Sequence, residues 1–552
     1  MSEYLENNGS PVIIVTVILL VSLLLISPVL FYGCPNGSAD LIHHLQIANA
    51  YVDSLRNGVL LPDWVTPENH SYGAVTVRFY PPLMHYTLAI FRLLLGNWNL
   101  ALFAAFSLWL FIGGIGVYYW SRDLFNSEWQ AMAAAVLSLF IPYHLIHFYN
   151  ASMFGEFAAF SILPFGFLFA RRVCIGGILN VIGLSICIAL LILSNLPQTI
   201  VGGLCIGIYS LFYLTKAKWP RQITLLFLSG VGGLALSAFY WVRVVVEMPW
   251  IVISQPPYDP DYDYRNHFLL NSLNLDNQGV WFVSLIFAGS VTVVIIALTV
   301  SAKHKELRTS RELWLIVVLF LVGSFMLLPL SKPIWDAFTS LQRVQFPWRF
   351  FSIVSLTHVI LTALALGFIT SENWRARRPA VLILSGLVII MMIFSVKQII
   401  LGAAYVEPER FASLPETSAS AKGLLHWRPI WANDKTSKIK DLVIAGGREA
   451  SVGESTGENR EILVAGGEPV RARLAILYYP LWKASINGES VPVESDGGAI
   501  AIDLPATPSH LLLTFAEPGY SLVSRYVSLA ALAALSILFV VCIFITRFRT
   551  HE

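Results

Sequence analysis

Long apolar runs dominate the pattern of hydrophobic and polar positions along the chain. A helix that crosses a bilayer needs about 20 mostly apolar residues, and runs of this length predict about twelve membrane-spanning helices. A shorter apolar stretch at 83–96 predicts a helix that lies in the membrane surface or dips into it. The twelve spans are expected at roughly 12–32, 99–120, 131–148, 156–170, 177–193, 198–215, 222–243, 278–300, 312–330, 350–369, 379–402 and 522–546.

The segment 404–520, between the last two predicted spans, has a different pattern. It is rich in Gly, Pro, Ser, Glu and Arg, and its second half alternates apolar and polar residues in short runs. Asn487-Gly488 stands between two of these runs and is a strong hairpin signal. The pattern predicts a membrane domain at 1–403, a small extracytoplasmic domain resembling a β-sandwich at 404–520, and a last span with a cytoplasmic tail at 521–552.

The first stretch after the first span predicts an amphipathic helix. Leu41, Leu45, Ala48, Val52 and Leu55 fall on one stripe at helical spacing. The opposite face is polar, so we expect this helix to lie flat at the membrane surface.

Composition agrees with a polytopic membrane protein. Of the 552 residues, 56% are hydrophobic and only 13% are charged, about half the charged share of an average soluble protein. The net charge of +2 gives no support for nucleic-acid binding. The five cysteines form no CxxC pair and no metal-ligand spacing.

Lys and Arg in the short loops indicate an orientation. With the N-terminus in the cytoplasm, the inward loops carry most of the basic residues, including Arg171, Arg172, Lys303 and Arg377. Counting 83–96 as a full span would place these clusters outside. The predicted orientation puts 33–98, 244–277, 331–349 and 404–520 on the outer side.

Two acidic residues stand where outer loops meet predicted helices. Asp40 begins the amphipathic helix just beyond the first span, and His43 and His44 follow within one turn. Glu156 stands at the mouth of another span. Asp40 could be an N-cap or a functional carboxylate at the membrane–water boundary, and Glu156 could simply favour a helix N-terminus. His43 and His44 could equally be polar-face residues.

The first outer loop resembles that of the GT-C membrane glycosyltransferases. The shared features are an acidic residue after the first span, a surface helix, a Gly58…Pro-Asp-Trp64 step and the Phe79-Tyr-Pro-Pro-Leu83 entry to the short helix at 83–96. More narrowly, the chain is similar to the bacterial membrane family named after a 6-pyruvoyl-tetrahydropterin-synthase-related domain and to YfhO-like proteins. The family name implies no pterin chemistry here.

Further motifs extend the resemblance over essentially the whole chain. Where relatives usually have Arg-Gly before the glutamate of the second outer loop, this chain has Met153-Phe-Gly155, and it has Ser194 where a His is usual. The matching segments are His147…Gly155-Glu156, Ser194-Asn-Leu-Pro197, Ala238-Phe-Tyr-Trp241…Glu247, Gln345-Phe-Pro-Trp-Arg-Phe350 and Tyr479-Pro-Leu-Trp482…Asn487-Gly488.

The resemblance implies transfer of a sugar from a polyprenyl-phosphate donor to an outer glycan, lipid or protein acceptor. Such a reaction belongs at the interface, because the lipid tail stays in the bilayer while phosphate and sugar stay wet. Asp40 is then the candidate base for the acceptor hydroxyl, and Glu156 a second catalytic carboxylate. An arginine would stabilise the leaving phosphate. Asp40, Glu156 and His44 are candidate ligands for a divalent cation, which some GT-C enzymes use and others do not.

Other residues are candidates for binding the substrate. Arg349 could clamp the donor phosphate, or it could snorkel from an aromatic belt. Glu247 could contact substrate, or it could pair with Arg243 at the interface. The full set of candidate substrate contacts is His43, His44, Arg78, Tyr80, Glu247, Gln345, Trp348 and Arg349.

Two other classes of protein fit parts of the pattern. A transporter of a lipid-linked or small solute would suit twelve spans, although the halves of this chain show no repeat and the acidic residues gather at the outer edge. A non-catalytic scaffold would use its β domain to bind partners. The interpretation favoured by the sequence is a transferase of the bacterial inner membrane, with its site and β domain outside the cytoplasm.

Overall fold

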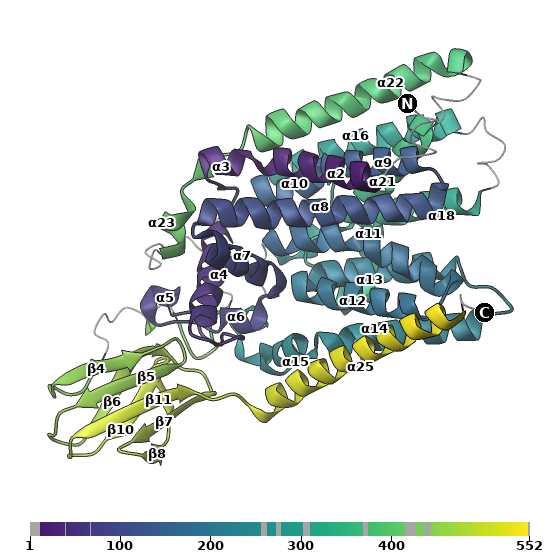
Figure 1. Ribbon diagram of the computed structural model, residues 1–552. Coiled ribbons are helices and arrows are strands. Elements are labelled where there is room, and N and C mark those ends of the chain that lie inside the picture. The colour runs from purple at the N-terminus through teal and green to yellow at the C-terminus, as the bar shows by residue number, and fades with distance from the viewer. Residues whose placement is uncertain are drawn as a thin grey trace.

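The computed structural model describes residues 11–38, 40–66, 68–254, 262–271, 278–301, 310–367, 374–413, 427–433, 435–436 and 443–549. A bundle of long helices makes up most of the structure, and a β region stands at one end of it (Figure 1). Helix α2 (Pro11–Ile26) begins at the opposite end of the bundle, where helix α25 (Gly519–Arg549) finishes. We call the end that carries the β region the loop end.

The helices of the bundle are long because apolar runs continue without interruption. They are α8 (Trp98–Phe125), α9 (Glu128–Leu139), α10 (Pro142–Tyr149), α11 (Phe154–Ile175), α12 (Leu179–Ser194), α13 (Leu196–Leu211), α14 (Trp219–Leu236), α15 (Ala238–Glu247), α16 (Gln278–Ser301), α18 (Arg311–Leu327), α21 (Phe351–Gly367) and α22 (Trp374–Phe394), with α2 and α25.

Among the described residues, eight helices are long and apolar enough to cross a membrane, or ten if each of two bent pairs counts as one span. The expected twelve spans are therefore not confirmed. The difference lies mainly in α12 and α13, which have 16 residues each. Asn195 breaks the run between them: its side chain accepts a hydrogen bond from the backbone N–H of Gln198 at 2.8 Å and starts a new helix.

Short helices gather at the loop end. They are α3 (Pro28–Tyr32), α4 (Asp40–Arg56), α5 (Glu68–Ser71), α6 (Thr76–Phe79), α7 (Leu83–Leu95), α19 (Lys332–Ala337), α20 (Thr339–Gln342), η7 (Pro347–Phe350) and α23 (Pro408–Ser413). Helix α4 runs across the ends of the long helices (Figure 1).

The two predicted surface helices both form. Of the expected apolar stripe of α4, Leu41, Leu45, Ala48 and Val52 are buried, and Leu55 at its end is partly buried. Helix α7 occupies the apolar stretch that is too short to span, and Leu94 on it is 72% exposed. An exposed leucine face is what a helix dipping into the membrane surface requires.

The β region contains two antiparallel sheets. One has the strand order β3-β6-β10-β9 and the other the order β4-β5-β11-β7-β8. The strands are β3 (Val443–Ile444), β4 (Ala450–Ser455), β5 (Asn459–Val464), β6 (Val470–Leu477), β7 (Trp482–Ile486), β8 (Glu489–Val491), β9 (Glu494–Asp496), β10 (Ala499–Leu504) and β11 (Ser509–Phe515).

The predicted hairpin is confirmed within the second sheet. Asn487 and Gly488 join β7 to β8, with φ of +52° and +89°. Two consecutive positive φ angles define the turn that suits the twist of a two-residue hairpin. Leu474 and Ile500 of the first sheet share a core cluster with Ile462 and Leu511 of the second.

A separate pair of short strands ties the first loop to the start of the insert. Strand β1 (Cys34–Pro35) pairs with β2 (Tyr405–Val406). The other end of the bundle carries basic residues: Arg172 Nε lies 2.7 Å from Asp123 Oδ2, and Arg171 Nη2 lies 3.3 Å from Glu312 Oε1. The acidic candidates and the basic clusters thus lie at opposite ends, and the assignment of one end to the cytoplasm stays a prediction.

Candidate functional site

The chain just before α4 packs directly on the loop that leads into α11. Ser38 Oγ donates a hydrogen bond to the Ala151 carbonyl at 2.9 Å. At Gly37, a Cβ atom would lie 2.2 Å from the carbonyl carbon of Asn150, so only glycine permits this approach. The two loops that carry Asp40 and Glu156 are therefore in contact.

Asp40 opens α4 at this junction and is partly buried. Burial raises the pKa of its carboxyl above the usual value of 3.8. Tyr80, from the Phe-Tyr-Pro-Pro step, lies within electrostatic reach of both Asp40 and Arg349. Burial raises the pKa of the Tyr80 hydroxyl, the charge of Asp40 raises it further, and the charge of Arg349 opposes them.

Arg349 and Glu156 form a buried ion pair. Arg349 Nε donates to Glu156 Oε1 at 2.5 Å, and the side chains are 8% and 2% exposed. His147 Nε2 lies 3.4 Å from the other carboxylate oxygen, Oε2. Glu156 stands in the first turn of α11, so the helix dipole and Arg349 both stabilise its charge. We call Asp40, Tyr80, His147, Glu156 and Arg349 the loop cluster.

Aromatic rings and carbonyl groups hold the Arg349 side chain. Its guanidinium lies 4.7 Å from the Phe346 ring and 5.7 Å from the Trp348 ring, and these two rings stack on each other at 4.9 Å. One terminal nitrogen, Nη1, donates to the Val344 carbonyl and lies 3.4 Å from Gln345 Oε1. Among the described residues, the other terminal nitrogen, Nη2, has no hydrogen-bond partner.

The short helix that carries Arg349 is tied to the bundle from two sides. Gln198 Nε2 donates to Ser352 Oγ at 2.5 Å, and Ser352 Oγ donates to the Arg349 carbonyl at 2.8 Å. On the other side, the Tyr143 hydroxyl donates to the Trp348 carbonyl at 3.0 Å. Gln198, which follows the Asn-Leu-Pro element at the start of α13, thus helps to hold the short helix that carries the arginine.

His43 and His44 are buried inside the loop end. The His44 ring stacks on Phe154 with centroids 4.6 Å apart, and its Nδ1 lies 3.1 Å from Nε2 of His85. Burial lowers the pKa of His43 and of His85 to about 4. Both imidazoles are therefore neutral at physiological pH.

The expected set of metal ligands does not come together. In the part of the chain that the structure describes, no group of three or more His, Cys, Asp or Glu side chains could hold a metal ion. Of the three candidates, Glu156 is paired with Arg349 and the ring of His44 is packed between Phe154 and His85. We therefore derive no step through a metal.

Arg78 and Glu247 are brought together, but with each other and apart from the loop cluster. Arg78 Nη2 lies 2.5 Å from Glu247 Oε1, and both side chains are fully buried. The same guanidinium pairs with Asp63, whose Oδ1 also lies 2.9 Å from Arg243 Nη1. The alternative pairing of Glu247 with Arg243 is wrong, because Arg243 forms its ion pair with Asp63 and Glu247 forms its ion pair with Arg78.

This network joins the membrane helices to the β region. The hydroxyl of Tyr479, between β6 and β7, donates to Glu247 Oε2 at 2.7 Å, and that of Tyr520, on α25, donates to Oε1 at 2.9 Å. Burial raises the pKa of Asp63, but the charges of Arg78 and Arg243 outweigh it and hold the pKa below the usual range. We call Asp63, Arg78, Arg243, Glu247, Tyr479 and Tyr520 the docking network.

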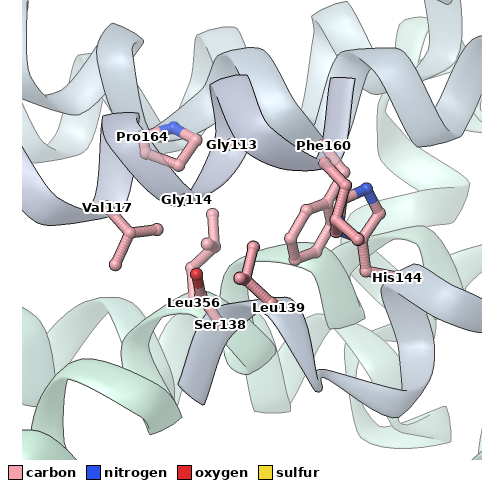
Figure 2. Close-up of a pocket in the computed structure, with 10 residues that line it drawn as sticks. Gly113, Gly114, Val117, Ser138, Leu139, His144, Phe160, Pro164 and Leu356 are labelled. Carbon is pink, nitrogen blue, oxygen red and sulfur yellow. The ribbon is translucent and has the colours of Figure 1, made fainter. Parts of the chain in front are cut away.

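A small cavity lies elsewhere, inside the bundle. Figure 2 shows Gly113, Gly114, Val117, Leu139 and His144 among the residues that line it. Its wall is apolar apart from Ser138 and His144. None of the loop cluster lines it, so it is no candidate for the chemistry.

Three contacts of the loop end were not foreseen from the sequence. His147 lies inside the quoted second-loop motif, on α10 and nine residues before Glu156, yet only the turn between α10 and α11 brings the two side chains together. Asp63 lies inside the Pro-x-Trp step, and Tyr479 inside the Tyr-Pro-Leu-Trp motif. In each case the motif marked the residue as a candidate, but the sequence did not show which distant residue it contacts.

The loop end and bundle define a polytopic membrane protein with a charged cluster where its loops converge. The model of a protein family described as a 6-pyruvoyl-tetrahydropterin synthase related domain, a membrane protein, matches residues 77–405, more than half of the chain. The chain belongs to this family, and the resemblance seen in the sequence is confirmed.

Solved structures similar to the chain include three membrane transferases. The mycobacterial arabinofuranosyltransferase AftD is 16% identical with a TM-score of 0.46, and the match covers 70% of this chain and 26% of AftD. ArnT from Cupriavidus metallidurans, bound to undecaprenyl phosphate, is 16% identical with a TM-score of 0.43, covering 69% of this chain and 64% of ArnT. The Archaeoglobus fulgidus oligosaccharyltransferase is 11% identical with a TM-score of 0.33, covering 76% and 60%.

The chain thus spans less than two thirds of the length of AftD and of ArnT. A comparison with curated protein sequences found no match.

Proposed function

We propose that the chain is a membrane glycosyltransferase that moves a sugar from a polyprenyl-phosphate donor to an acceptor hydroxyl at the loop end. The observation that carries the proposal is the loop cluster itself. A partly buried carboxylate, Asp40, and a cation, Arg349, both act electrostatically on Tyr80 where several loops converge. A carboxylate that takes a proton and a cation that receives a phosphate are the two groups that this transfer needs.

The reaction balances on these two groups. The acceptor oxygen attacks the anomeric carbon of the donor sugar, and its proton passes to the Asp40 carboxylate. The bond between the anomeric carbon and the phosphate oxygen breaks. The polyprenyl phosphate leaves with an additional negative charge, which the guanidinium of Arg349 stabilises.

Glu156 serves in this proposal as a positioning residue. Its Oε1 accepts from Arg349 Nε, which fixes the plane of the guanidinium and leaves Nη2 available to a phosphate oxygen. Sugar transfer from polyprenyl-phosphate sugars, measured with the full chain in proteoliposomes, tests the proposal. Uptake of a labelled solute without transfer would instead indicate a transporter, and neither activity would indicate a scaffold.

We expect Arg349→Lys to lower kcat/KM for the donor by about 10²-fold. A lysine ammonium is a compact charge without the planar set of donors of a guanidinium. It therefore cannot bind the Glu156 carboxylate and the Val344 carbonyl and also donate to a phosphate in a fixed geometry. Transfer rates at varied donor concentration measure this. The matched control is Arg343→Lys, because Arg343 lies in the same loop and is exposed. Equal activity of the two variants would contradict the role of Arg349.

The pH profile of kcat/KM should show an acidic limb above pH 3.8, the ordinary pKa of an aspartate. Burial raises the pKa of Asp40, and only the deprotonated carboxylate can accept a proton. Activity is therefore present above the raised pKa and is lost as the pH falls through it. Initial rates from pH 3.5 to 8, with protein integrity checked at each pH, measure the limb. A limb at or below pH 3.8 would assign the base elsewhere.

A further inference from the structure

A short segment of the insert reaches back to the loop cluster. Residues 427–432, which we call the strap, lie outside the part of the chain that the family model matches. The strap runs beside the chain that follows α15: Val252 N donates to the Arg428 carbonyl at 3.0 Å, and Ile430 N donates to the Trp250 carbonyl at 3.0 Å. Ile251 and Pro429 form an antiparallel bridge at the same place.

The strap places Trp427 against the Phe-Tyr-Pro-Pro step of the first loop. The Trp427 ring lies nearly parallel to the Phe79 ring, with centroids 5.9 Å apart and an interplanar angle of 29°. Its centroid is 5.3 Å from that of Tyr80. Tyr80 belongs to the loop cluster, and both Asp40 and Arg349 act electrostatically on it, so the indole contacts a residue of the site proposed for the chemistry.

The burial of these three rings differs in a way that suits binding. Phe79 is 1% exposed and forms a support, whereas Trp427 and Tyr80 are each only partly buried. A supported ring that keeps part of its surface open can stack on a ligand at little cost in side-chain freedom. Aromatic walls with a few convergent polar groups are typical of small-molecule sites.

We infer that Trp427 is a specificity-determining residue of the loop cluster, where its indole stacks on a carbohydrate ring. This inference rests on the proposed function and deepens it, because it makes the insert part of the substrate site. The apolar face of a sugar ring and a partly open indole are complementary in shape and polarity. Donor and acceptor sugars share this chemistry, and the kinetics below separate the two.

The test uses the full chain in nanodiscs and compares Trp427→Ala with Trp427→Phe and Trp431→Ala. Trp431 is the matched control, because it lies on the same strap and is partly buried, but its ring contacts Tyr478 of the β region, with centroids 5.2 Å apart. Melting temperatures of all variants come first. A strap that only holds the β region in place would make Trp427→Ala and Trp431→Ala equivalent.

The readouts are donor and acceptor KM, and the rise in melting temperature caused by citronellyl-phosphate hexose or pentose relative to citronellyl phosphate without sugar. We expect Trp427→Ala to raise one KM about tenfold, Trp427→Phe to restore most of it, and Trp431→Ala to leave both unchanged. A raised donor KM with loss of the sugar-dependent increment assigns the donor ring. A raised acceptor KM with that increment kept assigns the acceptor ring.

Two results overturn the inference, and they differ. Wild-type values of both KM and of the sugar-dependent increment in Trp427→Ala would remove the stacking role while leaving the proposed function in place. Failure of the wild-type protein to transfer sugar or to bind citronellyl phosphate would overturn the proposed function and this assignment with it.

Discussion

Asp40→Asn should lower kcat for sugar transfer by about 10²- to 10⁴-fold, the usual contribution of a general base. The substitution keeps the shape of the side chain and removes its ability to accept a proton. Because Asp40 makes no ion pair among the described residues, the variant should fold and melt like the wild type. Single-turnover transfer in proteoliposomes, with the melting temperature as a companion measurement, gives the result.

Asp53→Asn is the matched control for this variant. Asp53 lies on the same helix, α4, but its side chain is 58% exposed and only 3.8 Å from Arg56 in a surface pair. We expect no change in transfer. If Asp40→Asn were as active as Asp53→Asn, the base would have to be another group, and Glu156 would be the next candidate because it is the other carboxylate of the loop cluster.

Arg78→Ala should destabilise the protein by about 3–5 kcal/mol, because it leaves the buried carboxylate of Glu247 without its cation and Asp63 with Arg243 alone. The guanidinium is fully buried and pairs with both. The control is Arg471→Ala, which removes an exposed pair with Glu494 and should change the stability far less, because water screens such a pair. Thermal unfolding of both variants in the same detergent measures the difference.

This prediction separates two roles for Arg78. A substrate-binding arginine would lose transfer activity at unchanged melting temperature, whereas a docking arginine loses stability. A double-mutant cycle of Arg78→Met and Glu247→Met should show strong non-additivity, because each single variant leaves the other charged partner buried without its counter-charge. Melting of Arg78→Ala at the temperature of Arg471→Ala would contradict the docking role.

The difference between Arg78 and Arg349 shows what the sequence could and could not predict. Both are basic residues beside aromatic motifs, and both were candidates for binding the substrate. The pairing of Arg78 with Glu247 joins residues 169 positions apart, and its burial depends on the β region covering it. The local sequence around each arginine contains neither fact. Sequence alone therefore cannot distinguish an arginine with a structural role from one that is a candidate phosphate ligand.

Elements with strong periodicity were predicted well. The amphipathic helix at Asp40, the short helix at 83–96 and the Asn487-Gly488 hairpin follow from spacing and turn chemistry alone. The spans predicted at 177–193 and 198–215 are not confirmed, because hydropathy cannot weigh the cap at Asn195 against the apolar runs on both sides. The position of Trp427 beside the first loop could not be predicted for a different reason: nothing in the sequence indicates that the strap pairs with residues 250–252.

The most direct test of the account is a structure of the full chain in nanodiscs with citronellyl-phosphate hexose bound. The account predicts that a phosphate oxygen lies within hydrogen-bond distance of the Arg349 guanidinium, about 2.7–3.2 Å, and that the sugar lies between it and Asp40. A headgroup bound at the other end of the bundle, beside Arg171 and Arg172, would contradict it.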